Sequence, residues 1–395
     1  MRKFRLYPPG KMLFLLWTLL GINTIVAAQV TFPLNDVAHP RSDCYAFTNA
    51  TIVKDAQTTL QNSTLVIRQG KITAVGAGVA VPADAVVIDC KGKFIYPSFI
   101  DMYSDYGIPV PQRQAGGFNF NAPAQLTSSQ KGAFGWNQAI RADVEGVKLF
   151  NVDDSKAKTL RDIGFGTVLT HQKDGIARGT GVVVTLANEK ENLVIVKDKA
   201  SAHYSFSKGT STQSYPSSLM GTIALLRQTY LDAQWYKSNP AGEGVNLSLK
   251  SWQESQSLPQ VFEANDKWNV LRADRIGDEF GVQYIIKGGG NEYQRIKEMK
   301  ETKAAFILPL NFPAPMEVND PNDVRFVGLD NLKHWEMAPS NPAAFEKAGI
   351  PFCLTAADLQ NVNDFMANLR RAIQYGLSET KALEALTKTP ATLLG

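Results

Sequence analysis

Histidine is scarce among the residues of this chain that could do chemistry. Only four are present among 395 residues, at positions 39, 171, 203 and 334. His171 ends a predicted strand over residues 167–170, and Asp174 follows three residues later, so His171 could act as a general base oriented by a carboxylate. A histidine at a strand end more often only bonds to a loop, and His203 and His334 are predicted to lie in loops.

Carboxylates are better placed than histidines. Asp101, Asp105, Glu263 and Asp358 lie at or near the ends of predicted strands, where they could converge as oxygen ligands of Mg²⁺ or Ca²⁺ rather than Zn²⁺. Asp101 and Asp105 are the candidate metal ligands. We favour the simpler interpretation that these two are polar positions bonded to neighbouring strand ends, and we expect no bound metal.

Short apolar strands alternate with amphipathic helices from residue 99 onward. This alternation predicts parallel βα units and therefore the α/β class. The span of about 300 residues fits an elaborated (β/α)8 TIM-like barrel. Strands are predicted over 167–170, 260–262, 282–286, 304–310 and 351–354, and helices over 156–163, 217–236, 268–280, 293–302, 342–347, 361–375 and 378–387.

Residues 44–95 read instead as strands and turns. Apolar alternation on both sides of a glycine-containing turn at 69–71 predicts a hairpin, so this region is half of a β-sandwich preceding a barrel over 96–395. Cys44 and Cys90 lie in this region and could pair, whereas Cys353 is predicted to be buried in a barrel strand. Two glycine-rich segments, 179–181 and 288–290, are interpreted as turns, and residues 107–150 as a long loop over one barrel mouth.

The first 28 residues have the order of a secretory signal. Four basic residues precede an apolar run from Met12 to Leu20, and small residues lead to a predicted cleavage before Gln29. The signal holds four of the 41 Lys and Arg and none of the 37 Asp and Glu, leaving 37 of each sign and a net charge of zero. We therefore expect a periplasmic or secreted protein that binds no nucleic acid and is not embedded in a membrane after cleavage.

Several segments, in order, resemble the amidohydrolase superfamily and are nearest to its imidazolonepropionase-like members. The sheet region contributes residues 46–53, 70–76 and 88–93, and residues 96–101 (Y-P-S-F-I-D) resemble the P-G-F-I-D lead-in to the first barrel strand. The last helices contribute 376–378, 382–383, 385–387, 390–391 and 394–395. The resemblance spans residues 44–395 and implies a barrel that hydrolyses mostly carbon–nitrogen bonds with one or two divalent metals, zinc being suited to imidazole ligands.

The family's metal ligands have no counterparts here. Its H-x-H pair falls on Tyr103 and Asp105, its strand-5 histidine on Glu263 or Asn265, its strand-6 histidine on Gly288 beside Lys287, and its strand-8 aspartate on Ala357. The resemblance thus implies Asp358, one residue late, and His171 as the remaining catalytic candidates. Tyr103, Glu263, Asn265 and Lys287 are the substrate-binding candidates.

These observations predict an exported amidohydrolase-like domain that has lost its metal site and serves as a scaffold or binding domain for a linked hydrolase. One alternative is an active hydrolase of non-peptide carbon–nitrogen bonds with a carboxylate-rich site. Another is a barrel that binds a small molecule beneath the 107–150 loop. Because the family's sheet is completed by later strands that this sequence lacks, we also expect a downstream amidohydrolase unit in the same polypeptide.

Overall fold

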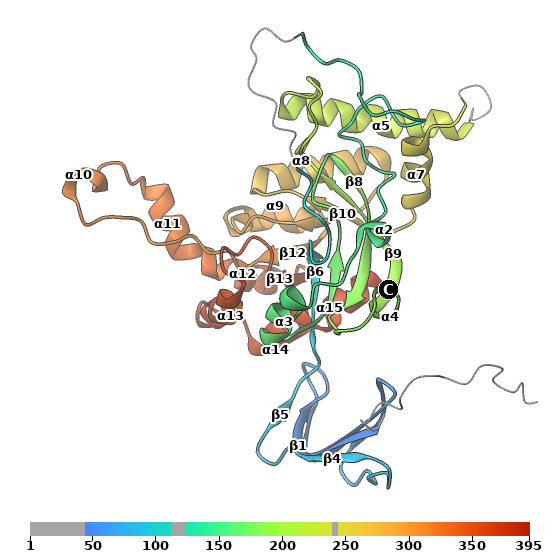
Figure 1. Cartoon of the computed structure of the whole chain (residues 1–395). Helices are drawn as coiled ribbons and strands as arrows, with labels where there is room; N and C mark the ends of the chain where they lie inside the picture. The colour runs from blue at the N-terminus through green and yellow to red at the C-terminus, as the bar shows by residue number, and fades with distance from the viewer. Residues whose placement is uncertain (1–43, 113–122, 239–243) are drawn as a thin grey trace, which may run out of the picture. The chain divides into compact units, whose positions relative to one another are not determined.

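The structure is a computed structural model that describes residues 44–112, 123–238 and 244–395 (Figure 1). The predicted signal over residues 1–28 lies outside the described residues. The chain divides into two compact units, and the small sheet and the barrel are described separately below. Within the described part of the chain, no helix combines the length and the apolar character needed to cross a membrane.

Eight strands form the barrel, and the predicted fold class is confirmed. They follow the chain in order around the barrel, and β13 also contacts β6, so the sheet is nearly closed. The strands are β6 (Phe99–Ser104), β7 (Phe165–Thr170), β8 (Ala177–Thr185), β9 (Ile195–Ser205), β10 (Gln260–Glu263), β11 (Ile285–Lys287), β12 (Ala305–Pro309) and β13 (Phe352–Thr355).

Strand β8 runs antiparallel to both of its neighbours, β7 and β9, while the other neighbouring pairs are parallel. The glycines at 179 and 181 lie inside this strand, so the interpretation of 179–181 as a turn is wrong. Gly179 has φ +78, and a Cβ there would lie 1.9 Å from the carbonyl oxygen of Val144. Glycine is required because the 139–146 segment passes directly over the strand at this point.

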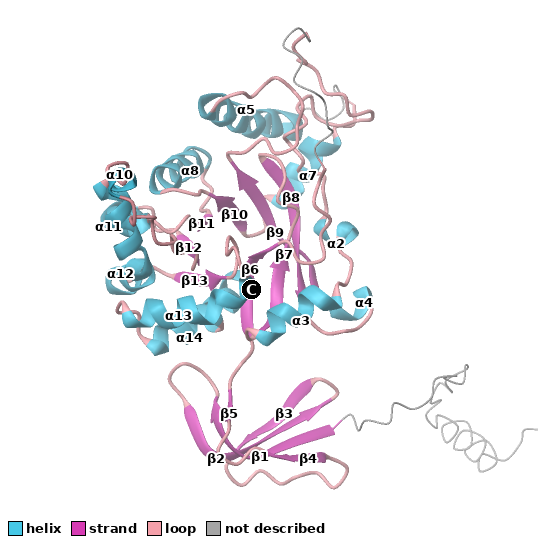
Figure 2. Cartoon of the chain, turned by 60° about the vertical axis from the view of Figure 1, so that its left-hand side comes forward, coloured by secondary structure: helices cyan, strands magenta, loops and turns pink. Residues whose placement is uncertain are grey.

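Helices surround the barrel (Figure 2). Local signals explain several of their ends: the Asp266 carboxylate accepts from the backbone N–H groups of Trp268 and Asn269, and Gly281 ends the same helix at φ +70. The helices are α2 (Gly146–Leu149), α3 (Asp154–Asp162), α4 (Glu191–Val194), α5 (Leu219–Ser238), α7 (Leu247–Ser255), α8 (Lys267–Phe280), α9 (Ile296–Glu301), α10 (Pro321–Val324), α11 (Leu329–Met337), α12 (Asn341–Ala348), α13 (Phe365–Gln374), α14 (Glu379–Leu386) and α15 (Lys388–Leu394). Short 3₁₀ turns are η1 (Glu292–Arg295), η2 (Ala338–Ser340) and η3 (Val362–Asp364).

The small sheet has the order β3-β2-β1-β4, with β5 also pairing with β1. Its strands are β1 (Cys44–Val53), β2 (Thr59–Arg68), β3 (Lys71–Gly76), β4 (Val86–Asp89) and β5 (Phe94–Ile95). β2 and β3 form the predicted hairpin.

The register of this sheet is incompatible with the suggested Cys44–Cys90 disulfide. Thr48 pairs with Asp89, so Cys90 lies beside Asn49, five residues along β1 from Cys44. That offset separates the two Cα atoms by roughly 16 Å, far beyond the reach of a disulfide.

The barrel interior is apolar below its mouth. Met102, Leu169, Val183, Ile307 and Cys353 meet there from five different strands, and all five are buried. A larger apolar layer lies between the strands and the helices and includes Phe165, Phe262 and Phe306. The predicted burial of Cys353 in a barrel strand is confirmed, and burial raises the pKa of its thiol.

Candidate functional site at the barrel mouth

Tyr103 stands at the centre of a polar network where the barrel strands end. It belongs to β6 and is almost fully buried. Its hydroxyl donates to Glu263 Oε2 at 2.8 Å and accepts from Arg178 Nη1 at 2.8 Å, and Arg178 also forms an ion pair with Glu263. Arg178 comes from β8 and further donates to the carbonyl of Gly175 at 3.1 Å. Three barrel strands therefore meet through one phenol, one carboxylate and one guanidinium.

The network continues from Glu263 to the strand ends of β11 and β13. Asn265 Nδ2 donates to Glu263 Oε1 at 2.8 Å, and Lys287 Nζ donates to Asn265 Oδ1 at 3.0 Å. Lys287 also pairs with Asp358. The Lys287 side chain is fully buried. Burying an ammonium group costs free energy unless it is paired and hydrogen-bonded, and Asn265 and Asp358 supply these contacts. The structure thus brings together the four substrate-binding candidates and Asp358.

Charge and burial set the protonation states of this network. Burial alone would raise the pKa of Glu263, but Arg178, Asn265, Lys287 and Tyr103 together lower it to about 2. Burial raises the pKa of Tyr103 well above its usual value, and Glu263 adds to that shift while Arg178 opposes it. Glu263 is therefore an anion and Tyr103 a neutral phenol at neutral pH.

Asp101 lies in β6, and its side chain links this strand to the end of β13. Its carboxylate accepts from Tyr103 N at 2.9 Å, Thr355 Oγ1 at 2.6 Å and Ala356 N at 3.1 Å. The two bonds from Thr355 and Ala356 come from a neighbouring strand end, as the simpler interpretation of this residue expects, and the bond from Tyr103 lies within β6. Burial raises the pKa of Asp101, and the three hydrogen bonds oppose that shift.

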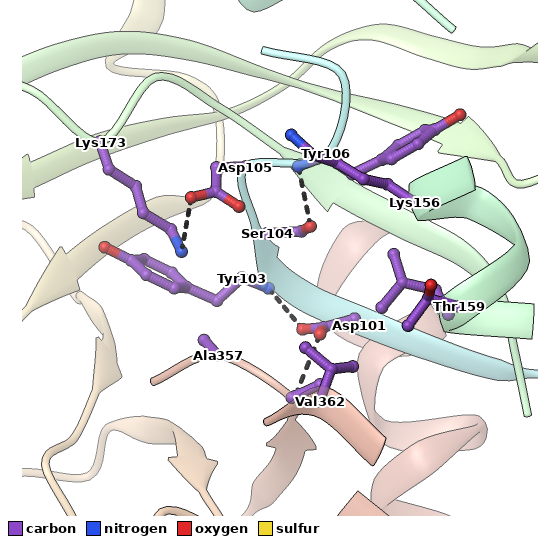
Figure 3. A pocket seen from close by; sticks show the side chains of 12 residues that line it. Asp101, Tyr103, Ser104, Asp105, Tyr106, Lys156, Thr159, Lys173, Ala357 and Val362 are labelled. Carbon is purple, nitrogen blue, oxygen red and sulfur yellow. Dashed lines mark hydrogen bonds and ion pairs between the residues drawn. The ribbon is translucent and has the colours of Figure 1, made fainter. Parts of the chain in front are cut away.

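Asp105 and Lys173 border a cavity of about 300 Å³ beside Tyr103 (Figure 3). Lys173 Nζ lies 3.6 Å from Asp105 Oδ2 and 5.0 Å from the centre of the Tyr103 ring. Asp101, Ala356 and Ala357 line the same cavity. The volume is at the lower end of the range of small-molecule pockets, about 300–1,000 Å³.

His171 and His203 form a buried stacked pair next to this network. Their rings are 3.5 Å apart and nearly parallel, and His171 packs edge-on to Tyr103 at 4.7 Å. The prediction that His203 lies in a loop is wrong, because it belongs to strand β9 and is fully buried; His334 likewise lies in helix α11. Burial lowers the pKa of both stacked imidazoles well below the usual value, and Arg178 and Lys173 lower it further.

The suggested pairing of His171 with Asp174 is not formed. Asp174 accepts from the backbone N–H and the hydroxyl of Thr210 at 2.6 and 2.7 Å and pairs with Arg141. Among the described residues, neither ring nitrogen of His171 has a hydrogen-bond partner. A general base needs an orienting partner and access to a substrate, and this buried imidazole has neither contact.

The side chains at this mouth do not suit a divalent metal. Arg178 and Lys287 place two positive groups against Glu263 and Asp358, the carboxylates that would otherwise be donors. The stacked geometry of His171 and His203 keeps their in-plane lone pairs from converging on one ion. In residues 44–112, 123–238 and 244–395, no group of three or more His, Cys, Asp and Glu side chains could hold a metal.

The glycines after β11 approach a neighbouring loop closely. A Cβ on Gly289 would lie 2.0 Å from the carbonyl oxygen of Asn265. The N–H groups of Gly289 and Gly290 donate to the buried carboxylate of Glu292, which also accepts from Asn341 Nδ2 at 2.9 Å. These amides are therefore occupied, and the glycines serve to bring the β10 and β11 loops together.

Two functional side chains, Arg178 and Lys173, were missed in the sequence. Lys173 lies in the loop between β7 and β8, and Arg178 lies in β8. The family's metal-ligand pattern has no position in this hairpin. The sequence does carry a signal for Arg178, because the other residues from Ile176 to Val184 are small or apolar. An arginine in such a run implies a buried ion pair.

The fold matches those of solved amidohydrolases. An amidohydrolase from Thermotoga maritima MSB8 aligns with a TM-score of 0.68 over 89% of this chain and 88% of that chain, at 21% identity. A prolidase and the beta-aspartyl dipeptidase of Fervidobacterium islandicum AW-1 align with TM-scores of 0.47 and 0.48, at 14% and 12% identity, over 89% and 90% of this chain and 87% and 88% of theirs. No protein-family model matches the sequence, and no curated protein matches it significantly. The resemblance to the amidohydrolase superfamily is thus confirmed at the level of the fold.

Proposed function

We propose that this chain is a non-catalytic amidohydrolase-fold domain of an exported protein, serving as a scaffold or binding domain for a linked hydrolase. The proposal depends on one observation, the presence of two ion pairs at the barrel mouth, Arg178–Glu263 and Lys287–Asp358. These pairs put a guanidinium and an ammonium group beside Glu263 and Asp358, at the mouth where the family binds its metal. Cationic side chains repel a divalent ion and satisfy the carboxylates that would bind it.

The same contacts argue against the carboxylate-rich hydrolase. Glu263 is bonded to Tyr103 and Asn265 as well as to Arg178, and Asp101 is bonded to three donors. The donors around Glu263 lower its pKa to about 2, so it is a weak base. The carboxylate oxygens of Asp101 are already bonded to its three donors.

A scaffold role is supported by the helices α10 and α11, which extend away from the barrel in Figure 1. Neither helix contains a buried residue, and the segment exposes Phe326, Leu329 and Val324. Large apolar side chains exposed together are typical of surfaces that contact other proteins. Export is proposed on the charge, apolar run and small residues of positions 1–28.

The test is the metal content of protein purified from the periplasm without chelators, measured by elemental mass spectrometry. We expect divalent metal far below one ion per chain and no hydrolysis of amide substrates. Near-stoichiometric metal that is lost on Asp105→Ala, with hydrolysis lost in parallel, would contradict the proposal. A variant at an exposed carboxylate elsewhere, Glu279→Gln, controls for adventitious binding to surface carboxylates.

A further inference from the structure

In two ion pairs of the barrel mouth, the lysine is less exposed to solvent than the aspartate. The Lys287 side chain is fully buried while that of its partner Asp358 is 37% exposed, and Lys173 is 27% exposed while Asp105 is 58% exposed. In five of the six other lysine ion pairs among the described residues the lysine is the more exposed partner, as in Lys158–Asp162, and in Lys381–Glu384 the two side chains are almost equally exposed. A more exposed lysine is the usual arrangement, because a lysine extends its ammonium into water. At the mouth, the cations lie inside and the aspartates cover them.

We infer that the barrel mouth binds a small dicarboxylate, whose two carboxylate groups take the places of Asp358 and Asp105 beside Lys287 and Lys173. This inference rests on the proposed function, since in a mouth without a bound metal the cations that an anion can meet are the side chains of Lys173 and Lys287. Asp105 and Asp358 then act as internal counter-ions that hold the cations until the ligand arrives.

The two ammonium groups lie near the same aromatic ring. Lys173 Nζ is 5.0 Å and Lys287 Nζ is 5.6 Å from the centre of the Tyr103 ring. The inference requires a ligand that lies across this ring and pairs with both. The cavity of about 300 Å³ borders Tyr103, Asp105 and Lys173, and the small side chains of Ala356 and Ala357 leave room in it (Figure 3).

The carboxylates of this mouth differ in how firmly they are held. Glu263 belongs to strand β10 and is bonded at both oxygens, to Tyr103 and to Asn265. Asp358 follows β13 with a left-handed backbone, φ +64, and within the part of the chain that the structure describes Lys287 is its one hydrogen-bond partner. Asp105 follows the end of β6 and pairs only through the 3.6 Å contact with Lys173. Glu263 is thus fixed, whereas the two aspartates can move aside without moving a barrel strand.

The test is isothermal titration calorimetry of the full chain with glutarate, compared with its neutral isostere glutaramide and with inorganic phosphate. Asp358→Asn removes one internal competitor, so glutarate should bind about tenfold more tightly than to the wild type, the equivalent of about 1.4 kcal/mol. Asp105→Asn should act in the same direction. Lys173→Met should weaken binding, and raised salt should weaken it in every variant.

Two matched controls separate this site from general charge effects. Glu279→Gln removes one carboxylate from the exposed pair with Arg227 and should leave glutarate binding unchanged. Asp105→Asn alters an exposed residue and keeps the inference testable if Asp358→Asn fails to fold. If the Asp358→Asn variant folds, glutarate should also raise its melting temperature more than it raises that of the wild type, because glutarate restores a counter-ion to Lys287.

Equal binding of glutarate and glutaramide, equal binding of phosphate, or no gain in either aspartate variant would overturn the inference. These outcomes are distinct from a failure of the proposed function. Metal-loaded protein that hydrolyses amides would contradict the proposed function, whatever glutarate does. Metal-free, inactive protein that ignores glutarate would overturn only the dicarboxylate site.

Discussion

The hydroxyl of Tyr103 lies between two opposite charges, 2.8 Å from Glu263 Oε2 and 2.8 Å from Arg178 Nη1. In the sequence resemblance to amidohydrolases Tyr103 falls at the first histidine of the H-x-H pair, and in this structure it bridges an ion pair. The three groups come from strands β6, β10 and β8. This bridge helps to hold the barrel mouth together.

Glu263→Gln should therefore destabilise the protein strongly. The substitution leaves Arg178 buried with no counter-charge from Glu263, and breaking a buried pair in this way costs about 3–5 kcal/mol. The free energy of unfolding, measured by urea denaturation followed by circular dichroism, should fall by that amount. The double variant Arg178→Met/Glu263→Gln removes both charges and should be less destabilised than Glu263→Gln alone. A double variant as unstable as the sum of the two single variants would show that the charges do not interact.

Asp101 and Asp105 should differ sharply when each is replaced by alanine. Asp101→Ala leaves two buried backbone N–H groups and the Thr355 hydroxyl without their acceptor, and should cost about 2–4 kcal/mol. Asp105→Ala loses only a partly exposed ion pair and should cost about 0–1 kcal/mol. Urea denaturation of both variants tests this difference. Equal losses would mean that Asp101 is not the residue that joins β6 to β13.

Most of the fold was predictable because many of the barrel elements carry a local signal. Strands β10, β12 and β13 are short apolar runs, and helix α8 is bracketed by Asp266 and Gly281. The antiparallel course of β8 was not predictable in this way. Its glycines resemble a turn, and only the close approach of the backbone at Val144 explains them.

The candidate site was predictable where a residue occupies a position of the family pattern. Tyr103, Glu263, Asn265 and Lys287 were found for that reason. Arg178 and Lys173 were missed because the pattern has no position for them. His203 was predicted to lie in a loop because the charged run 197–199 near the start of β9 obscures the apolar alternation of this strand. The stacking of His171 on His203 joins residues from strands that are not adjacent in the sheet, and no spacing in the sequence indicates it.

The buried histidine pair predicts a loss of stability on mild acidification. Burial keeps the folded-state pKa of His171 and His203 well below the unfolded value of about 6.5, so the unfolded state binds more protons. Their contribution is fully present above about pH 6.5 and is lost as the pH falls below it. The slope can reach about 2.7 kcal/mol per pH unit for the two residues together. Glu263, whose pKa is lowered from 4.5 to about 2, adds a second loss only below pH 4.5.

Unfolding free energies measured between about pH 7 and pH 5 test this prediction, because Glu263 does not titrate there. His203→Gln keeps a partner for Ser201 and should reduce the slope, since one of the two titrating imidazoles is gone. His334→Gln replaces a half-buried histidine of α11 and is the matched control. An equal slope in the wild type and in His203→Gln would contradict the neutral, buried state of the pair. The comparison is needed because Asp274, whose pKa burial raises to about 6, titrates in the same range with the opposite sign.

Gly289→Ala should disturb the site through Asn265. An added Cβ would lie 2.0 Å from the Asn265 carbonyl oxygen, so that loop must move, and Asn265 is the residue that links Glu263 to Lys287. Forcing a methyl group into such a contact costs about 1–3 kcal/mol. The matched control is Gly281→Ala, at φ +70 with nothing within 4 Å of its added Cβ, which should cost about 1–2 kcal/mol through backbone strain alone. The two variants should therefore lose similar stability, but only Gly289→Ala should weaken glutarate binding in calorimetry. Equal glutarate affinity in both would mean that Asn265 does not position Lys287.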